Sequence, residues 1–432
     1  MKIIARLLAF LSVAASGVLY LRIRAPISPL KGNLWIVRLL AGAVTPFIVL
    51  IGTVGAGPAL LVRSPITMFT GMLGAALAAR DIRQVTASHP GFEQVFGESW
   101  ERAIAPEQQV RMLSRRWTWH LPAAPAAHFQ QDIPFWTLLD SDRTLFCDLW
   151  QPPPGVAPSG VAVVYLHGSA WYLLDKDFLT RPFFHHRTAQ GHVIMDVAYR
   201  LYPETDMQGM VGDAKRAIAW MKSQGPAYGV DPERIVMAGG SAGGYLALLA
   251  AYTPNEPELR PENVGNADLT VRGVISCYGP TDAQAYYEHT RQDTWGDLGQ
   301  VIVDRPPGPL TKRLFGTSYE RLGLGKTGAV GAMEPLLGGT PDTVPDRFAL
   351  YSPTSHVESS CPPTLLIQGK NDVISPIDAA NSLYEELVTA GVPAVHIVFP
   401  HAEHGFDLTL PRWSPSAQTA WYYQERFLAL ML

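Results

Sequence analysis

The stretch that decides the fold is residues 235–252, with the sequence IVMAGGSAGGYLALLAAY. An apolar, β-branched run ends at Gly239, and Ser241 stands just before residues 242–252, which have the composition of a helix. A serine on a sharp turn between a strand and a helix is held in a strained conformation that exposes its hydroxyl, and the free amides of the helix N-terminus favour negative charge beside it. The pattern predicts that Ser241 is a nucleophile; the alternative is an ordinary glycine-rich turn.

The rest of the chain alternates short apolar runs with helical stretches, which is typical of a mostly parallel central sheet flanked by helices on both faces. The expected strands are residues 133–139, 144–150, 161–167, 192–199, 235–239, 271–278, 364–369 and 395–400. The expected helices are residues 209–223, 242–252, 377–390 and 416–430. The sequence therefore predicts an α/β catalytic domain over residues 131–432, in which the long irregular section 283–360 is a cap insertion near the site.

A glycine-containing turn, His167-Gly168-Ser169, follows the run at residues 161–166. Acyl transfer needs hydrogen-bond donors aimed at the tetrahedral oxyanion, and a turn at this place in an α/β sheet can supply backbone amides for it. We therefore expect the amides of Gly168, Ser169 and Ala242 to form an oxyanion hole. The alternative is that this segment is only a turn.

A serine hydroxyl needs a base to take its proton, and the base needs a carboxylate behind it. Asp372 and His404 each follow a predicted strand, so both leave the carboxyl edge of the sheet, where open α/β sheets place their sites. His401 is an alternative base, although it lies nearer its strand and lacks a following glycine. Asp282 is an alternative acid that also fits the N-cap of a helix. The sequence predicts a catalytic triad of Ser241, Asp372 and His404.

Four ordered motifs resemble the hormone-sensitive-lipase-like carboxylesterases, which have the α/β-hydrolase fold. The motifs are residues 240–244 (GSAGG), the His167-Gly168 turn, residues 196–204 (DVAYRLYPE) and residues 404–406 (HGF). The resemblance covers residues 130–432. It implies hydrolysis of carboxylic esters through an acyl-enzyme, with the triad and oxyanion donors named above and with no cofactor.

The chain departs from this family at two places. The family usually has His-Gly-Gly-Gly or His-Gly-Gly-Ala in the turn at His167, whereas this chain has Ser169 and Ala170 after Gly168. Gly240 stands where the family often has an acidic residue. Backbone donors survive such changes, so the departures bear on the class of substrate rather than on the reaction.

The first eighty residues predict membrane-anchoring helices. Residues 3–21 are apolar except for Arg6, residues 39–62 are uncharged over about the length of one bilayer crossing, and residues 64–79 form a shorter uncharged run. The charged content of the whole chain is only 17%, below the roughly 25% of ordinary soluble domains. The alternatives are a cleaved signal peptide for the first run, or buried helices of a soluble cap for all three runs.

Basic residues between the first two runs predict the orientation of the chain. Arg22, Arg24, Lys31 and Arg38 lie in this connection, and basic loops prefer the cytoplasm. Three spans would place the rest of the chain in the cytoplasm, whereas two would leave it outside. Membrane attachment favours a lipophilic ester as substrate, and residues 81–130, which mix charges with tryptophans, are expected to form linker or cap helices that roof the site.

Several other functions are disfavoured by composition. A net charge of −4 gives no broad attraction to nucleic acid, so we expect no nucleic-acid partner. Three widely spaced cysteines, and the neighbouring histidines His185 and His186, lack further ligands at metal-binding spacing, so we expect no metal.

Two alternative functions remain open. The chain could be a serine peptidase or amidase with the same triad, or an inactive membrane scaffold. The sequence does not predict the oligomeric state.

Overall fold

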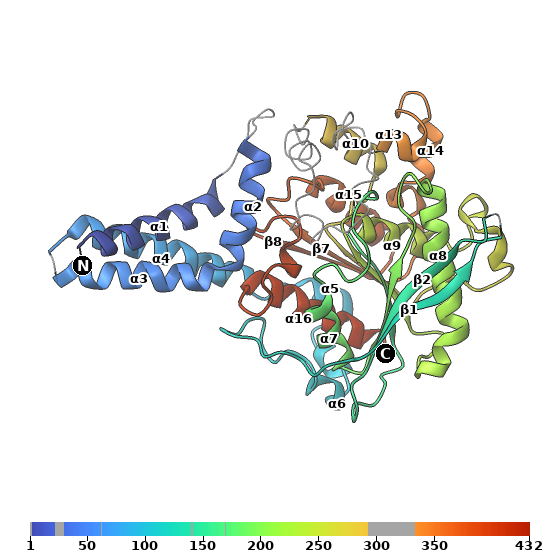
Figure 1. Ribbon diagram of the computed structural model, residues 1–432, viewed down its shortest axis with the longest axis horizontal. Coiled ribbons are helices and arrows are strands. Elements are labelled where there is room, and N and C mark those ends of the chain that lie inside the picture. Colours follow the sequence, from blue (N-terminus) through green and yellow to red (C-terminus); the bar gives the residue numbers. More distant parts are fainter. Residues whose placement is uncertain (1, 22–29, 62, 140, 169, 293–332) are drawn as a thin grey trace.

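The structure is a computed structural model that describes residues 2–21, 30–61, 63–139, 141–168, 170–292 and 333–432. Figure 1 shows a rounded domain built around a sheet and a slender group of N-terminal helices that projects from it. The two parts touch at a junction formed by the loops that follow the last two strands.

One eight-stranded sheet forms the centre of the domain, in the order β1-β2-β4-β3-β5-β6-β7-β8. β1 and β2 are antiparallel, and β3 to β8 run parallel to one another. The strands are β1 His128–Thr137, β2 Thr144–Gln151, β3 Ala162–Leu166, β4 Val193–Ala198, β5 Ile235–Gly240, β6 Gly273–Cys277, β7 Thr364–Gly369 and β8 Ala394–Phe399. All eight predicted strands are present, and the predicted mostly parallel sheet is confirmed.

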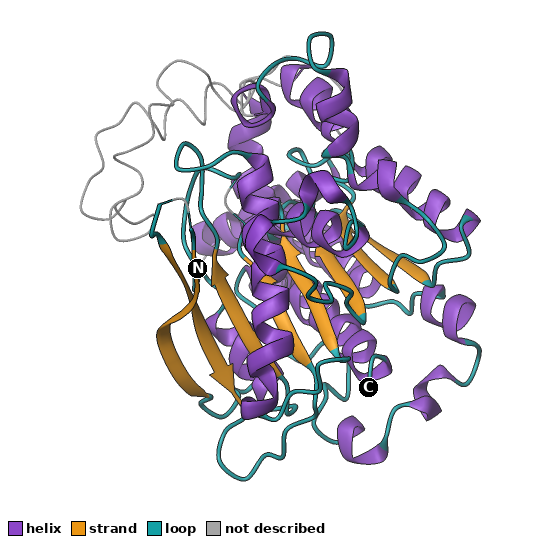
Figure 2. Cartoon of the chain, turned by 90° about the vertical axis from the view of Figure 1, so that its right-hand side faces the viewer, coloured by secondary structure: helices purple, strands orange, loops and turns teal. Residues whose placement is uncertain are grey.

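Helices cover both faces of the sheet (Figure 2). One apolar core lies under α8 Met207–Gln224, α9 Ala242–Tyr252 and α15 Ile377–Thr389, and a second lies under α7 Arg181–Thr188 and α16 Pro415–Leu430. Every residue of β3, β5 and β7 is buried, which explains why these strands are continuous apolar runs rather than alternating ones. The four predicted helices are confirmed within two residues at each end, whereas α7, which contains two histidines and two arginines, was not predicted.

Most of the segment expected to form linker or cap helices lies away from the predicted site. It forms three short helices, α5 Gly91–Phe96, η1 Trp100–Ala103 and α6 Pro106–Gln109. The ring of Phe92 stacks on Tyr423 of α16 with centroids 5.6 Å apart, and a Cβ on Gly91 would lie 3.0 Å from Val395 at the start of β8. These short helices therefore pack on the α16 face near the amino end of β8, because that is where their aromatic residues are buried. Residues 81–85 instead belong to α4, whose Asp81 contacts His401 just after β8.

The predicted insertion forms α10 Ala283–Gln292, α13 Met333–Leu337, α14 Pro345–Leu350 and η7 Pro353–His356, and residues 293–332 lie outside the described residues. Tyr286 of α10 makes an edge contact with Trp171, with ring centroids 5.5 Å apart. His289 Nε2 lies 2.9 Å from the carbonyl oxygen of Val373. Since Trp171 follows the glycine turn and Val373 follows Asp372, α10 borders the predicted site.

The N-terminal helices form a bundle of three with a fourth across its base (Figure 1). α1 Lys2–Tyr20, α3 Thr45–Leu61 and α4 Pro65–Val85 pack on one another, and α2 Leu30–Ala43 lies crosswise beside the domain. Among the described helices, α1 is long and apolar enough to cross a membrane, and α2 with α3 forms a second candidate that is bent by 78°.

Small residues fill the interior of this bundle, and large apolar residues cover its outside. Ser12 Oγ donates a hydrogen bond to the carbonyl of Ile48 at 3.2 Å, and Ser16 Oγ donates to the carbonyl of Gly74 at 2.8 Å. The exposed residues on the outside are Ile3, Ile4, Leu7, Phe10, Leu11, Leu50, Val54, Ile66, Phe69, Met72 and Leu73. This distribution is the reverse of that in a water-soluble helical bundle and is typical of helices that pack within lipid.

We expect Gly74→Leu to separate α1 from α4, because a Cβ at Gly74 would lie 2.3 Å from Ser12 Oγ and 2.5 Å from the backbone nitrogen of Val13. Overpacking of this kind destabilises by about 1–3 kcal/mol, so the thermal midpoint in detergent should fall. Gly57→Leu is the matched control, since a Cβ there has no neighbouring atom within 4 Å. Equal midpoints for the two variants would contradict the close packing of the bundle.

Candidate active site

Ser241 lies on the sharp turn between β5 and α9. Its backbone has φ 55° and ψ −124°, a conformation that non-glycine residues rarely adopt, and its N–H donates a hydrogen bond to the carbonyl of Cys277 at 2.9 Å. A Cβ on Gly243 would lie 1.9 Å from the carbonyl oxygen of Leu166 in β3. Glycine at this position thus allows α9 to approach the sheet closely enough to form the turn.

The glycine turn after β3 lies against this serine. A Cβ on Gly168 would lie 3.3 Å from Ser241 Cβ and 3.0 Å from the carbonyl oxygen of Gly240. Ala242 is the first residue of α9 and is buried. Two of the three expected oxyanion donors, Gly168 and Ala242, therefore flank Ser241, while Ser169 lies outside the described residues.

His167 anchors the turn from inside the domain. Its imidazole stacks on the ring of Tyr199 with centroids 4.5 Å apart, and the Tyr199 hydroxyl donates a hydrogen bond to the carbonyl of His167 at 2.7 Å. Burial lowers the pKa of His167 to about 4, so the imidazole is neutral at physiological pH. A neutral, buried ring has a structural role in this turn and adds no charge beside Ser241.

Asp372 and His404 form a hydrogen-bonded pair at the carboxyl edge of β7 and β8. His404 Nδ1 lies 2.9 Å from Asp372 Oδ2, and the two side chains are 8% and 0% exposed. The other carboxylate oxygen of Asp372 accepts hydrogen bonds from the backbone N–H groups of Ile374 at 2.8 Å and Ser375 at 2.9 Å, and Gln368 donates to Oδ2 at 3.0 Å. These donors fix the carboxylate so that it can orient the imidazole.

The two alternative residues have other partners. His401 Nδ1 lies 3.0 Å from Asp81 Oδ1, on α4 of the N-terminal bundle. Asp282 accepts a hydrogen bond from the backbone N–H of Ala285 at 2.7 Å, in the first turn of α10, which is the helix-capping contact expected of it. The structure therefore pairs His404 with Asp372 rather than His401 with Asp282.

Tyr278 lies between the serine turn and the histidine, and sequence reasoning missed it. Its ring centroid is 4.5 Å from that of His404, and its hydroxyl donates a hydrogen bond to Asp407 Oδ1 at 2.6 Å. A Cβ on Gly240 would lie 3.0 Å from the same hydroxyl. Tyr278 thus occupies the space that a side chain at position 240 would need, which explains the glycine there. The available signal was an aromatic residue directly after a central strand.

In the part of the chain that the structure describes, the Ser241 hydroxyl has no hydrogen-bond partner, and no group of three or more His, Cys, Asp or Glu side chains is arranged to hold a metal. Catalytic hydrogen bonds in ligand-free sites are often long and tighten when substrate binds. The chemistry that these described residues offer is nucleophilic attack assisted by a base.

Two family profiles match the chain. The family described as BD-FAE matches residues 147–312, which include the glycine turn and Ser241, and the prolyl oligopeptidase family matches residues 331–426, which include Asp372 and His404.

Three of the curated relatives come from Mycobacterium tuberculosis. The probable carboxylic ester hydrolase LipM is 29% identical over 62% of this chain and 54% of its own length. The esterase LipC is 27% identical over 63% and 59%, and the esterase LipQ is 26% identical over 78% and 73%. The chain spans a little over half the length of the first two relatives.

Solved esterases share the fold. A thermophilic esterase from Thermogutta terrifontis with propionate bound has a TM-score of 0.52 at 21% identity, covering 71% of this chain and 95% of its own. Esterase B from Lactobacillus rhamnosis has a TM-score of 0.52 at 20% identity, covering 79% and 95%. The chain therefore has the α/β-hydrolase fold, and its relatives are carboxylic ester hydrolases.

Proposed function

We propose that this protein is a membrane-anchored serine hydrolase that cleaves a lipophilic carboxylic ester through an acyl-enzyme. The observation that carries the proposal is the strained turn that presents Ser241, together with the buried Asp372–His404 pair at the same edge of the sheet. The esterase relatives support the reaction class. No metal or organic cofactor is required for this chemistry.

In the proposed mechanism, Ser241 Oγ attacks the ester carbonyl while its proton passes to His404 Nε2. Asp372 holds the opposite ring nitrogen and stabilises the imidazolium. The oxyanion accepts hydrogen bonds from the amides of Gly168, Ser169 and Ala242, and His404 returns the proton to the departing alcohol. Water then repeats the sequence on the acyl-enzyme and releases the acid.

A fluorophosphonate should label the wild-type chain and should not label Ser241→Ala, because the probe traps an activated serine. Asp372→Asn should retain the fold but lower kcat by roughly 10⁴-fold, since an amide favours the wrong tautomer of His404. Both are measured by in-gel labelling and by hydrolysis of a p-nitrophenyl ester. Full labelling of Ser241→Ala would defeat the assignment of the nucleophile.

A serine peptidase or amidase is the second candidate, and the match of residues 331–426 to the prolyl oligopeptidase family favours it. The relatives LipM and LipC are a probable carboxylic ester hydrolase and an esterase, so we expect short acyl p-nitrophenyl esters to show a higher kcat/KM than the corresponding peptide p-nitroanilides. Ser241→Ala is the control for background hydrolysis of each substrate. Preferential cleavage of the anilides would favour the peptidase.

The N-terminal bundle supports the membrane part of the proposal. α1 has 19 residues, so it is about 28 Å long, close to the roughly 30 Å hydrocarbon core of a bilayer. Its hydroxyl contacts with α3 and α4 make α1 an integral part of the bundle, which favours an anchor over a cleaved signal peptide. The exposed apolar side chains of all three helices would then face lipid.

α2 is suited to lie in the plane of the membrane surface. It meets α3 at 78°, so it runs along the surface when α3 crosses the bilayer. Ile36, Val37 and Leu40 are exposed on it, whereas Arg38 is buried against the domain. In the proposed orientation the active-site side of the domain would lie next to lipid, which supports an ester that arrives from the bilayer.

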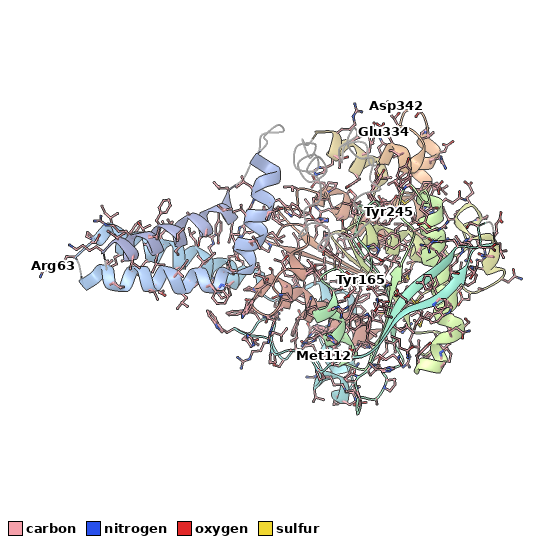
Figure 3. All side chains as sticks on the ribbon, in the orientation of Figure 1. Arg63, Met112, Tyr165, Tyr245, Glu334 and Asp342 are labelled. Carbon is pink, nitrogen blue, oxygen red and sulfur yellow. The ribbon has the colours of Figure 1, made fainter. Side chains whose placement is uncertain are left out.

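The basic residues at the two ends of the bundle support a cytoplasmic domain. Arg63 lies at the far end of the bundle (Figure 3), where α1 also begins with Lys2 and Arg6 (Figure 1), whereas Arg80 and Arg83 lie at the end beside the domain. Arg22, Arg24 and Lys31 follow α1 in the sequence and precede most of α2. Basic connections prefer the cytoplasm, so these residues favour a cytoplasmic domain.

We expect a membrane-impermeant maleimide to label Arg63→Cys on intact cells and to label Glu98→Cys only after the cells are lysed. Both positions are exposed, and the native cysteines, Cys147, Cys277 and Cys361, are buried and should react slowly. The wild-type chain controls for that background. Labelling of Glu98→Cys on intact cells would reverse the orientation.

A further inference from the structure

The loop that carries His404 contacts the N-terminal helices through three of its residues. We call this set of contacts the histidine-loop latch, and it joins α2 and α4 to the five residues, 400–404, between β8 and Gly405. Its members are Trp35, Arg38 and Asp81 on the helices, and His401, Glu403 and His404 on the loop.

The most direct contact reaches the histidine itself. Trp35 Nε1 on α2 donates a hydrogen bond to the backbone carbonyl of His404 at 3.2 Å. The indole is partly buried against the domain core, so its position is fixed by packing as well as by the hydrogen bond. A helix outside the catalytic domain therefore holds the backbone of the residue that pairs with Asp372.

A buried ion pair holds the neighbouring residue. Arg38 Nε lies 3.1 Å from Glu403 Oε1, and the two side chains are 5% and 0% exposed. Burial raises the pKa of Glu403 to about 9, and the Arg38 guanidinium acts in the opposite direction. Because desolvation offsets much of its Coulombic gain, a buried pair is weak support for stability and its best-attested role is to specify one arrangement of the chain.

The third contact comes from α4. His401 Nδ1 lies 3.0 Å from Asp81 Oδ1, and the ring of Tyr20 lies 4.3 Å from the His401 ring. The loop that carries Asp372 also contacts the N-terminal helices, since Asn371 Nδ2 donates a hydrogen bond to the carbonyl of Leu19 on α1 at 3.4 Å. Both catalytic loops therefore border the helices.

The acid and the base nevertheless depend on different supports. Asp372 is fixed by its own loop, through the N–H groups of Ile374 and Ser375. His404, in contrast, lies on a loop whose Glu403 and His401 side chains contact Arg38 on α2 and Asp81 on α4. A shift of α2 would therefore act directly on the His404 loop, and would reach Asp372 only through the contacts between the two loops, such as the hydrogen bond from the Asn371 N–H to the carbonyl of Ala402 at 3.0 Å.

We propose that the N-terminal helices position the catalytic base, with Trp35 and Arg38 as positioning residues, so that hydrolysis requires α2 to be seated on the domain. This inference rests on the proposed function. It makes the membrane helices part of the catalytic apparatus rather than a tether, and it links the activity of Ser241 to the state of the surrounding lipid.

Trp35→Phe is the sharpest test, because it removes the N–H donor to His404 and keeps an aromatic ring. In the full-length chain in vesicles, kcat for a p-nitrophenyl ester and the rate of fluorophosphonate labelling should fall on the order of 10-fold with little change in KM, since a misplaced catalytic group can cost as much as about 100-fold. Trp119→Phe is the matched control, because Trp119 is 49% exposed and contacts Phe47 of α3 instead of the loop.

A second pair of variants separates positioning from folding. Arg38→Met should lower kcat in the same way, and Arg38→Lys, which keeps the charge beside Glu403, should recover part of it. A merely structural role would lower the thermal midpoint and the labelled fraction, and would leave the labelling rate of the folded chains unchanged. That result, or equal kcat for Trp35→Phe and Trp119→Phe, would overturn the proposal. Absence of labelling in the wild-type chain would instead refute the proposed function itself.

Discussion

The close approach of α9 to β3 is the constraint on which the site depends. Gly243 rests against the carbonyl of Leu166, and only a residue without a side chain allows this distance. The approach forces Ser241 into a positive φ and brings the glycine turn of β3 beside it. Everything else in the site is arranged around a serine whose position is decided by backbone packing rather than by its own hydrogen bonds.

The site combines residues from several different parts of the fold. The serine and the glycine turn belong to the central strands, and Asp372 belongs to a loop that satisfies its own carboxylate. His404 is shared between that carboxylate, the ring of Tyr278 and the N-terminal helices. The histidine is therefore the member of the proposed triad most exposed to events outside the domain.

The sequence predicted the parts of the fold whose signals are local. The central strands β3, β5 and β7 were continuous apolar runs because they are buried on both faces, and the serine turn carried its own glycines. Tyr278, and the contacts of His401 and Glu403 with Asp81 and Arg38, were not predictable, because they join residues more than a hundred positions apart. The location of residues 91–109 on the α16 face was not predictable for a related reason, since amphipathic spacing shows that a face is buried but not which element it packs against.

The 78° corner between α2 and α3 has a geometric consequence. Because α2 contacts the histidine loop, this angle sets the distance between the reaction centre and the plane in which α2 lies. In the proposed arrangement, a molecule dissolved among lipids meets the serine only if its carbonyl rises to that level while its hydrocarbon part remains below. The distance to which a substrate can extend its carbonyl above the bilayer surface would then select among substrates, before contacts with pocket side chains do.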